Sequence, residues 1–181
     1  MPHAPHPDRK FPSEQYEAVL DGVAERVAGR KPRRVLELGV GSGALTRRLL
    51  ARMPGVTLVG VDLASGTVQR ATAAVPAIEL FQHDLTTLPL PPETAGCDVA
   101  AATFLLHELP DEQQLGLLAY LLGESLREGG ACVVGDVCVP GIAESHLALD
   151  VFVPKAEALG LHVESEQVGA YAAVLVVSGA G

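Results

Sequence analysis

The sequence has no tryptophan, 4% aromatic residues and only three cysteines. The cysteines, Cys97, Cys132 and Cys138, lie in apolar segments, and no pair of them has the spacing of a zinc finger. An odd number of cysteines in such segments is typical of small buried side chains in a reducing compartment. We therefore expect neither a disulfide framework nor a metal site.

Long apolar runs are also missing, although 48% of the residues are hydrophobic. No run approaches the roughly 20 apolar residues that a membrane-spanning helix needs. The first residues, MPHAPHPDRKFP, are polar and rich in proline and lack the apolar centre of a signal peptide. We expect a cytoplasmic protein in which residues 1–12 form a flexible tail and residues 13–181 form one domain.

Basic residues are scarce over most of the chain, whose net charge is −9. Residues 1–70 hold eleven Lys and Arg against seven acids, whereas residues 71–181 hold two against fifteen. This balance disfavours nucleic acid as a partner, because phosphate contacts dominate that affinity. A basic cluster between Arg26 and Arg34 is the one feature in favour, and it also suits the carboxyl end of a helix.

The pattern that is present is an alternation of short apolar runs with helix-like segments. Strands are predicted at residues 34–38, 57–61, 78–82, 98–103, 131–137, 162–167 and 172–178. Alternating strands and helices favour a parallel sheet, and the short link between the last two strands makes them antiparallel. The sequence predicts an α/β fold, a Rossmann-like doubly wound sheet of seven strands, six parallel and the C-terminal one antiparallel.

The helices are predicted from the spacing of apolar residues and from start and stop signals. They are expected at about residues 13–29, 44–52, 65–74, 111–126 and 142–159. Ser13 and Ser65 are the expected N-caps of the first and third helices. Pro154 is expected to kink or split the last one, because proline lacks the N–H group that a helix interior uses.

A glycine-rich turn between the first strand and the second helix is the main functional signal. Residues 35–50 read VLELGVGSGALTRRLL, with Gly39, Gly41 and Gly43 between an apolar strand and a helix. Glycine permits positive φ and has no Cβ to keep a ligand away from the backbone. The start of the following helix offers free N–H groups and a partial positive charge to an anion.

Polar residues follow the other predicted strands. Ligands of open α/β sheets collect at the carboxyl ends of the strands. The residues there are Glu37, Asp62, Asp84, Thr103 with His107, and Asp136. Asp62 follows Gly39 at a distance that suits an acid binding a ribose diol, but Gly39, Gly41 and Ala44 also satisfy the dinucleotide pattern G-x-G-x-x-A. The turn alone therefore leaves NAD open as a ligand.

Five segments in order favour a different cofactor through a family resemblance. ELGVGSG (37–43), LVGVDLA (58–64), QHDLTTLPL (82–90), CDVAAATFLLHELPDEQQ (97–114) and LREGGACVVGDV (126–137) resemble the motifs of class I S-adenosylmethionine-dependent methyltransferases. Each segment is weak alone, and the five in sequence are a strong signal. The terminal hairpin also fits that family.

The resemblance implies roles for the donor site. Gly39, Gly41 and Gly43 would line the methionine part of S-adenosyl-L-methionine, and Glu37 would organise its ammonium group. Asp62 would hold the ribose hydroxyls. The alternative for Glu37 is a salt bridge to Arg33 or Arg34.

The resemblance also implies adenine and methyl contacts. Leu63 would lie against the adenine, while Asp84 and the Leu85 N–H would bind the ring. Thr103 and Phe104 would flank the sulfonium. The alternative for Asp84 is a plain turn residue.

His107 is the candidate catalytic base, because methyl transfer needs alignment and sometimes a base, and histidine titrates near neutral pH. Glu108 could orient it. The alternative is that His107 only packs beneath the acceptor pocket.

The methyl acceptor is less defined. The strand-four end reads ATFL in place of the Asn/Asp-Pro-Pro-aromatic motif of base N-methylating enzymes, and no Asp…Asp-Asn set for a catechol-type magnesium site is evident. Phe11, Tyr16 and Phe104 are the nearest rings for a planar acceptor. The region after strand five is short, so the pocket is open, closed by the first helix and tail, or completed by a second copy in a homodimer.

The function expected is methyl transfer to an oxygen, nitrogen or carbon of a small or medium-sized acceptor molecule. Two other classes stay open from the sequence. One is an NAD-linked oxidoreductase or epimerase, which the Asp84-Leu85 pair and the terminal hairpin disfavour. The other is a cofactor-binding, methyltransferase-like protein without activity.

Overall fold

The computed structural model describes residues 12–66, 78–139 and 146–179. Its strands are β1 (Arg34–Leu38), β2 (Thr57–Asp62), β3 (Ile78–Gln82), β4 (Cys97–Thr103), β5 (Leu126–Val137), β6 (Leu161–Val168) and β7 (Ala172–Gly179). Its α-helices are α1 (Ser13–Gly29), α2 (Ala44–Arg52), α4 (Asp111–Tyr120) and α5 (Leu149–Ala158). Two short 3₁₀ turns, η2 (Pro92–Thr94) and η3 (Leu106–Glu108), and a π-helical turn, η4 (Leu121–Ser125), complete the list.

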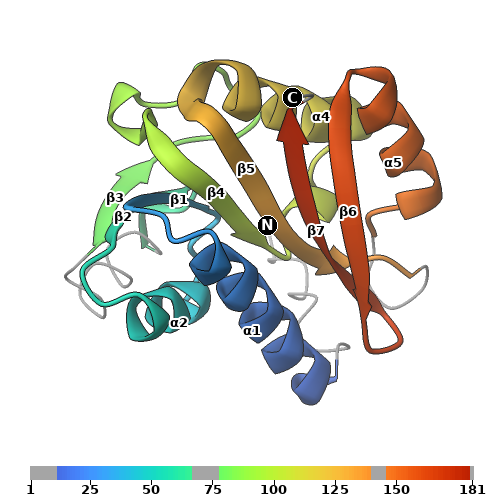
Figure 1. Cartoon of the computed structure of the whole chain (residues 1–181), viewed down its shortest axis with the longest axis horizontal. Helices are drawn as coiled ribbons and strands as arrows, with labels where there is room; N and C mark the ends of the chain where they lie inside the picture. The colour runs from blue at the N-terminus through green and yellow to red at the C-terminus, as the bar shows by residue number, and fades with distance from the viewer. Residues whose placement is uncertain (1–11, 67–77, 140–145, 180–181) are drawn as a thin grey trace.

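The seven strands form one sheet in the order β3-β2-β1-β4-β5-β7-β6 (Figure 1). The pairings from β3 to β5 are parallel, whereas β7 is antiparallel to both β5 and β6. The predicted sheet, with one antiparallel C-terminal strand, is therefore confirmed. The strand order reverses between β1 and β4, which places the switch point of the sheet between the glycine turn and the end of β4.

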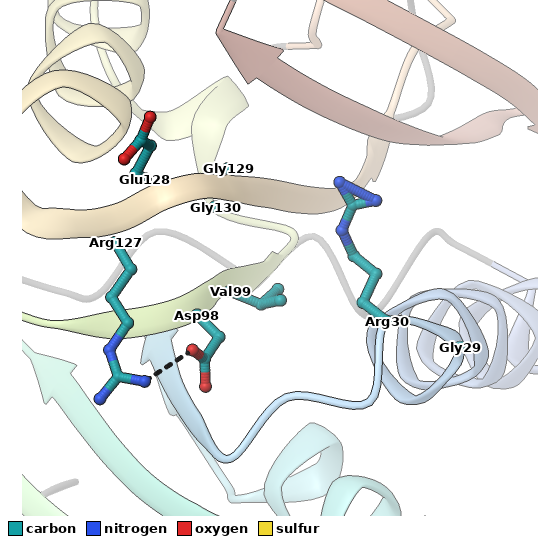
Figure 2. A pocket seen from close by; sticks show the side chains of 8 residues that line it. All are labelled: Gly29, Arg30, Asp98, Val99, Arg127, Glu128, Gly129 and Gly130. Atoms are coloured by element: carbon teal, nitrogen blue, oxygen red, sulfur yellow. Dashed lines mark hydrogen bonds and ion pairs between the residues drawn. The ribbon is translucent and has the colours of Figure 1, made fainter. Parts of the chain in front are cut away.

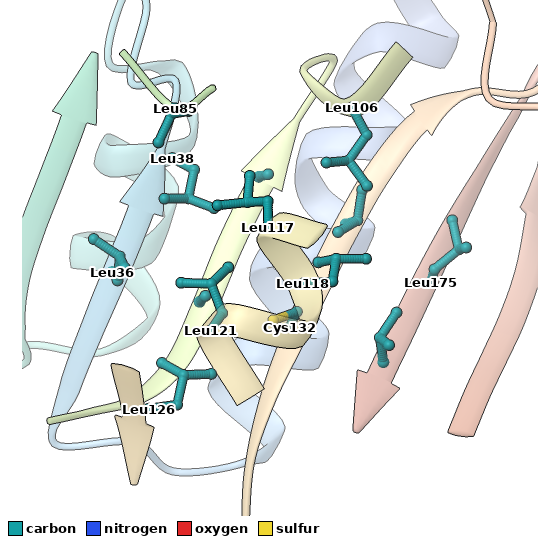
Figure 3. Close-up of a cluster of buried hydrophobic side chains, with 14 of the residues drawn as sticks. Leu36, Leu38, Leu85, Leu106, Leu117, Leu118, Leu121, Leu126, Cys132 and Leu175 are labelled. Atoms are coloured by element: carbon teal, nitrogen blue, oxygen red, sulfur yellow. The ribbon is translucent and has the colours of Figure 1, made fainter. Parts of the chain in front are cut away.

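The sheet is covered on both faces. On one face, α1 and α2 bury residues such as Leu20 and Leu49 against the sheet. On the other face, α4, η4 and α5 contribute leucines such as Leu118 and Leu121, and Phe152, to a larger cluster (Figures 1 and 3). The apolar runs of the central strands follow from this arrangement, because a strand that is buried on both faces has no polar side.

A glycine in β5 allows α1 to approach the sheet closely. An added Cβ at Gly135 would lie 2.5 Å from Cγ1 of Val19 and 2.7 Å from Cγ2 of Val23, both on α1. Its neighbours Val134 and Val133 pack on opposite faces, as alternation along a strand requires. The position of α1 over the carboxyl ends of β4 and β5 therefore depends on a missing side chain in β5.

All three cysteines are unpaired, and Cys97 and Cys132 are buried in the core as expected, whereas Cys138 is partly exposed. Within residues 12–66, 78–139 and 146–179, no helix is both long and apolar enough to cross a membrane.

Three helix predictions were wrong in detail. Ser13 is the first residue of α1 and Pro12 its N-cap, so Ser13 does not cap the helix. The fourth helix changes to a π-helical turn at Leu121 and gives way to β5 at Leu126. Residues 146–148 are not helical, and α5 begins at Leu149 and continues through Pro154 without splitting.

Two predictions lie largely outside the described residues. Residues 1–11 of the expected tail and most of the helix expected after Ser65 lie outside the described residues.

The described chain shows one further feature that was not expected. β5 begins five residues early, and its register with β4 shifts between the pairs Cys97–Leu126 and Val99–Ala131, so β5 contains a bulge at residues 127–130.

Candidate active site

The glycine-rich turn adopts the conformation that its glycines predict. Gly39, Gly41 and Gly43 have φ angles of 66°, 53° and 73°, in the region that favours glycine. Gly43 is the N-cap of α2, so the turn leads directly into the start of that helix. An added Cβ at Gly39 would lie 3.1 Å from Cδ1 of Leu105, which comes from the segment after β4. The turn therefore exposes backbone between β1 and α2 and contacts the loop that follows β4.

Asp62 lies beside this turn, as the sequence predicted. It ends β2, which pairs with β1, and it is 9% exposed. The Gly41 N–H donates to Oδ2 of Asp62 at 2.9 Å, and the Ala64 N–H donates to Oδ1 at 3.0 Å. The next side chain, Leu63, lies just after β2 and is 64% exposed. A carboxylate and an uncovered apolar side chain therefore flank the turn.

Glu37 lies beneath the turn and is only 1% exposed. The Thr46 hydroxyl on α2 donates to its Oε2 at 2.7 Å. Burial raises the pKa of Glu37 to about 7, although the hydrogen bonds from Thr46 and the positive charge of Arg47 act in the opposite direction. The site therefore holds a buried carboxyl group that changes charge near neutral pH.

The alternative interpretation of Glu37, a salt bridge to Arg33 or Arg34, is wrong. The backbone N–H groups of both arginines donate to Oδ2 of Asp98, at 2.8 and 2.9 Å. The Arg34 guanidinium donates to the carbonyl oxygen of Glu93. These contacts lie at the start of β1, whereas Glu37 lies near its carboxyl end.

Asp84 and Leu85 follow β3 at the same edge of the sheet. Oδ1 of Asp84 accepts hydrogen bonds from the backbone N–H and the hydroxyl of Thr86, at 2.9 and 2.8 Å. These bonds lower the pKa of Asp84 below its ordinary value. Asp84 therefore does act as a turn residue through one carboxylate oxygen. The Leu85 side chain is buried in the core, so its backbone is the part that remains for a ligand.

Thr103 and Phe104 lie where β4 ends. Phe104 has a φ angle of 52°, which is strained for a residue with a bulky side chain, and its N–H donates to the Gly135 carbonyl oxygen at 2.8 Å. The ring of Phe104 stacks on that of Tyr16 on α1, with centroids 5.1 Å apart and an angle of 12° between the planes. Tyr16, one of the rings considered for a planar acceptor, packs against the core and also contacts a candidate site residue.

His107 is buried and not open to the surface of the site. Its side chain is 1% exposed, and its Nδ1 lies 2.5 Å from Oδ1 of Asp136, the residue before the end of β5. Nε2 lies 3.7 Å from Oε1 of Glu108. Burial alone would lower the pKa of His107, but the hydrogen bond and charge of Asp136, with a further contribution from Glu108, raise it overall.

Most of these positions were predicted from the sequence, whereas several of their partners were not. Asp136 was noted as a strand-end acid, yet nothing linked it to His107. Thr46 and Leu105 were not singled out, although one bonds Glu37 and the other covers Gly39. A lone acid inside the apolar run of β5 is the signal that would have pointed to a buried partner for Asp136.

A separate cavity of about 440 Å³ lies at the opposite end of the sheet (Figure 2). It is bounded by the end of α1 and by the first residues of β4 and β5, including Arg30, Asp98 and Arg127. Arg127 is paired with Asp98 at 3.2 Å, and both are partly open to water. Since the turn, Asp62 and Thr103 all lie at the carboxyl ends of their strands, this cavity does not belong to the candidate site. Among the described residues, no group of His, Cys, Asp and Glu could hold a metal ion.

Comparison with known proteins places the chain among methyltransferases. A family model described as a methyltransferase domain matches residues 35–130. An uncharacterized methyltransferase of Geobacillus thermodenitrificans is 32% identical over 127 residues, 68% of this chain and 57% of that protein. A trans-aconitate 2-methyltransferase of Methylobacterium nodulans is 33% identical over 126 residues, 69% of this chain and 46% of that protein. The chain spans about half the length of these curated relatives.

Solved structures share the fold at lower identity. The methyltransferase domain of bacterial CtHen1-C has a TM-score of 0.74 and 17% identity, covering 92% of this chain and all of that chain (100%). Human N-acetylserotonin methyltransferase in complex with S-adenosylmethionine has a TM-score of 0.67 and 17% identity, covering 84% of this chain and 49% of that one. At 17% sequence identity, the likeness to these two structures shows a shared fold and nothing beyond it.

Proposed function

Because the chain belongs to the class I S-adenosylmethionine-dependent methyltransferase family, we propose that it transfers a methyl group from S-adenosyl-L-methionine to a small or medium-sized acceptor. The acceptor atom is an oxygen, a nitrogen or a carbon. NAD-linked oxidation is not favoured, since the family model and the named relatives all belong to methyltransferases.

One observation carries this proposal: the hydrogen bond between the Gly41 N–H and Asp62. It joins the glycine turn after β1 to the acid after β2, two features that the sequence separates by 21 positions. A turn without Cβ atoms, a strand-end carboxylate and the exposed Leu63 together suit a ligand with a polar tail, a ribose and a flat apolar ring. The residues present therefore fit S-adenosylmethionine.

We assign the donor contacts as follows. The backbone of Gly39, Gly41 and Gly43 and the carboxyl group of Glu37 bind the methionine part. Asp62 accepts hydrogen bonds from the ribose hydroxyls, and Leu63 packs against the adenine. Because Glu37 is only 1% exposed, we assign it to act on the ammonium group through water or through the turn, and a positive partner would stabilise its buried carboxylate form.

Asp84 and the Leu85 N–H bind the adenine ring in this assignment. Only Oδ1 of Asp84 carries the contacts to Thr86, so Oδ2 is the oxygen we assign to the adenine amino group. Thr103 and Phe104 flank the methyl group, at the end of the strand next to β1.

The cofactor, when bound, supplies an activated methyl group on a positive sulfur, so the chain need not activate the donor. The residues of the chain bind, align and exclude water. Phe104 and Tyr16 form the apolar side of the space beyond Thr103, and their stacked rings hold α1 against the end of β4. This arrangement supports a first helix that partly closes the acceptor pocket.

The class of acceptor, the cellular location and the oligomeric state are part of the same proposal. A small-molecule acceptor is supported by the relative named a trans-aconitate methyltransferase. The net charge of −9 disfavours nucleic acid, and three unpaired cysteines support a cytoplasmic location. A homodimer that completes the pocket stays a proposal that gel filtration with light scattering tests.

Calorimetry with S-adenosylmethionine, S-adenosylhomocysteine and NAD tests the function. We expect the first two ligands to bind and NAD not to bind. The variant Asp62→Ala should lose about 1–3 kcal/mol of binding free energy, because charged hydrogen bonds to the ribose disappear. The matched control Asp150→Ala removes an exposed acid on α5 and should bind like the wild type. Unchanged affinity in Asp62→Ala would refute the site assignment.

Binding alone does not separate an enzyme from a non-catalytic relative. Incubating the protein with S-adenosylmethionine and a panel of hydroxyl, amine and carboxylate acceptors, with detection of released S-adenosylhomocysteine, makes that distinction. Release with at least one acceptor supports the enzyme. Tight cofactor binding with no release across the panel favours the non-catalytic alternative.

A further inference from the structure

The segment of residues 104–109 connects the two sides of the candidate site. Its first residue, Phe104, bonds through its N–H to Gly135 of β5 and stacks on Tyr16. Its second residue, Leu105, covers Gly39, the first glycine of the donor turn. The position of this segment therefore determines what surrounds both the donor turn and the end of β4.

Asp136 holds this segment by two hydrogen bonds to one residue. Its Oδ2 accepts from the His107 backbone N–H at 3.2 Å, and its Oδ1 accepts from the His107 ring at 2.5 Å. The Val137 N–H donates to Oδ1 as well, at 2.8 Å. Asp136 is fully buried (0% exposed), so these groups replace water around its carboxylate.

The contacts of His107 also decide which of its ring atoms carry hydrogen. Since Asp136 is the acceptor, Nδ1 of His107 must be the donor. Nε2 faces the carboxylate of Glu108 at 3.7 Å. Asp136 on β5 and Glu108 on the same segment are the charged groups that act on this ring, and both favour its positive form. A ring that is protonated on both nitrogens has no lone pair to accept a proton from a methyl acceptor.

From this geometry, and on the premise of the function proposed above, we propose that Asp136 and His107 form a positioning pair. The pair fixes residues 104–109 against the donor turn, and His107 acts as a buried cation and not as the catalytic base. This replaces the base role considered from the sequence. The 1% exposure of the His107 side chain supports the replacement, because a base must reach the proton that it removes.

Three substitutions separate a positioning pair from a base. Asparagine at position 107 places an amide N–H close to where Nδ1 lies, but it has no atom at the place of Nε2. His107→Ala removes the ring bond to Asp136 and leaves the backbone N–H bond, whereas Asp136→Ala removes both bonds. We expect the two alanine variants to weaken S-adenosylhomocysteine binding roughly tenfold, whereas His107→Asn stays within about threefold of the wild type, because it keeps the bond.

The protonation state is measured directly on the wild-type protein. Histidine-selective ¹⁵N NMR, with His107 identified by the signal that His107→Asn lacks, should show both ring nitrogens protonated at neutral pH. A neutral ring with an unprotonated Nε2 would overturn the proposal, and so would wild-type affinity in both alanine variants. This measurement needs only His107→Asn to fold, and it does not depend on either alanine variant.

Failure of this proposal and failure of the proposed function give different results. If the wild type does not bind S-adenosylhomocysteine, the proposed function fails, while the NMR measurement still tests the pair. Suppose instead that the wild type binds S-adenosylhomocysteine, that His107→Asn no longer methylates an acceptor that the wild type methylates, and that Asp136→Ala still does. That result would restore the base role of His107 and refute the pair.

Discussion

The candidate site has two halves that are built in different ways. The half that we propose for the donor consists of the glycine turn, Glu37, Asp62 and Leu63, and its main contacts are backbone N–H groups that point to a neighbouring carboxylate. The acceptor half consists of residues 103–109, Asp136 and Tyr16, and its contacts are side chains that meet across three elements. The donor half therefore depends mainly on backbone conformation, whereas the acceptor half depends on how side chains of different elements pack.

The largest effect should come from the buried acid of the donor half. Because burial raises the pKa of Glu37 from 4.5 to about 7, the unfolded chain ionises first as the pH rises, and the ligand-free fold loses stability between these two values. The loss amounts to about 3 kcal/mol at most. Glu37→Gln keeps an acceptor for Thr46 and should not show this loss.

Urea unfolding at about pH 5 and pH 8 tests this prediction, and the exposed Glu112→Gln serves as the control. The gap between Glu37→Gln and the wild type should widen in favour of the variant as the pH rises. Parallel profiles of the two proteins would mean that Glu37 has the same pKa in the folded and the unfolded chain, which would contradict the pKa shift caused by burial.

The second prediction tests whether backbone conformation defines the donor half. Gly39→Val places a branched side chain at a φ of 66°, next to Leu105, and should weaken S-adenosylhomocysteine binding about a hundredfold. Gly55→Val is the matched control, because Gly55 also has positive φ (91°) but nothing lies within 4 Å of its added Cβ. Both variants should lose stability, and only Gly39→Val should lose binding in calorimetry.

The third prediction concerns the packing that supports the acceptor half. Gly135→Ala introduces a Cβ that collides with Val19 and Val23, and it should lower the free energy of unfolding by about 2 kcal/mol. Gly116→Ala, on α4 with open space around it, should raise stability by roughly 0.5–1 kcal/mol. Thermal and urea unfolding measure both. A Gly135→Ala protein as stable as the wild type would show that α1 can move away without cost.

The smallest effect should come from the stacked rings of the acceptor half. A double-mutant cycle with Tyr16→Ala and Phe104→Ala should give a coupling energy of about 1 kcal/mol in urea unfolding. A cycle between Tyr16→Ala and Asp84→Ala provides the control, since those residues belong to different halves and should show no coupling. Zero coupling between the two rings would remove the stack as a support for α1.

Local elements were predicted well from the sequence, and the reason is physical. β1 and β3 have the predicted bounds. Each is a short run, largely apolar, between a turn and a polar residue at the strand end, and these flanking residues fix where the strand can begin and end. The failures lie where tertiary contacts override local signals. α5 begins at Leu149 and tolerates Pro154, and β5 starts early with a bulge at residues 127–130 that no local pattern marks.

The sequence by itself determined the parallel sheet, the terminal hairpin and the donor turn. The strands follow from the periodicity of apolar residues, and the turn follows from glycines whose φ angles other residues rarely adopt. Both signals depend only on residues that are close together in the sequence. Only the tertiary structure decided that Glu37 bonds Thr46, that Tyr16 stacks on Phe104 and that Asp136 holds His107. Such contacts join residues on different elements of the fold, and packing alone brings them within hydrogen-bonding or stacking distance.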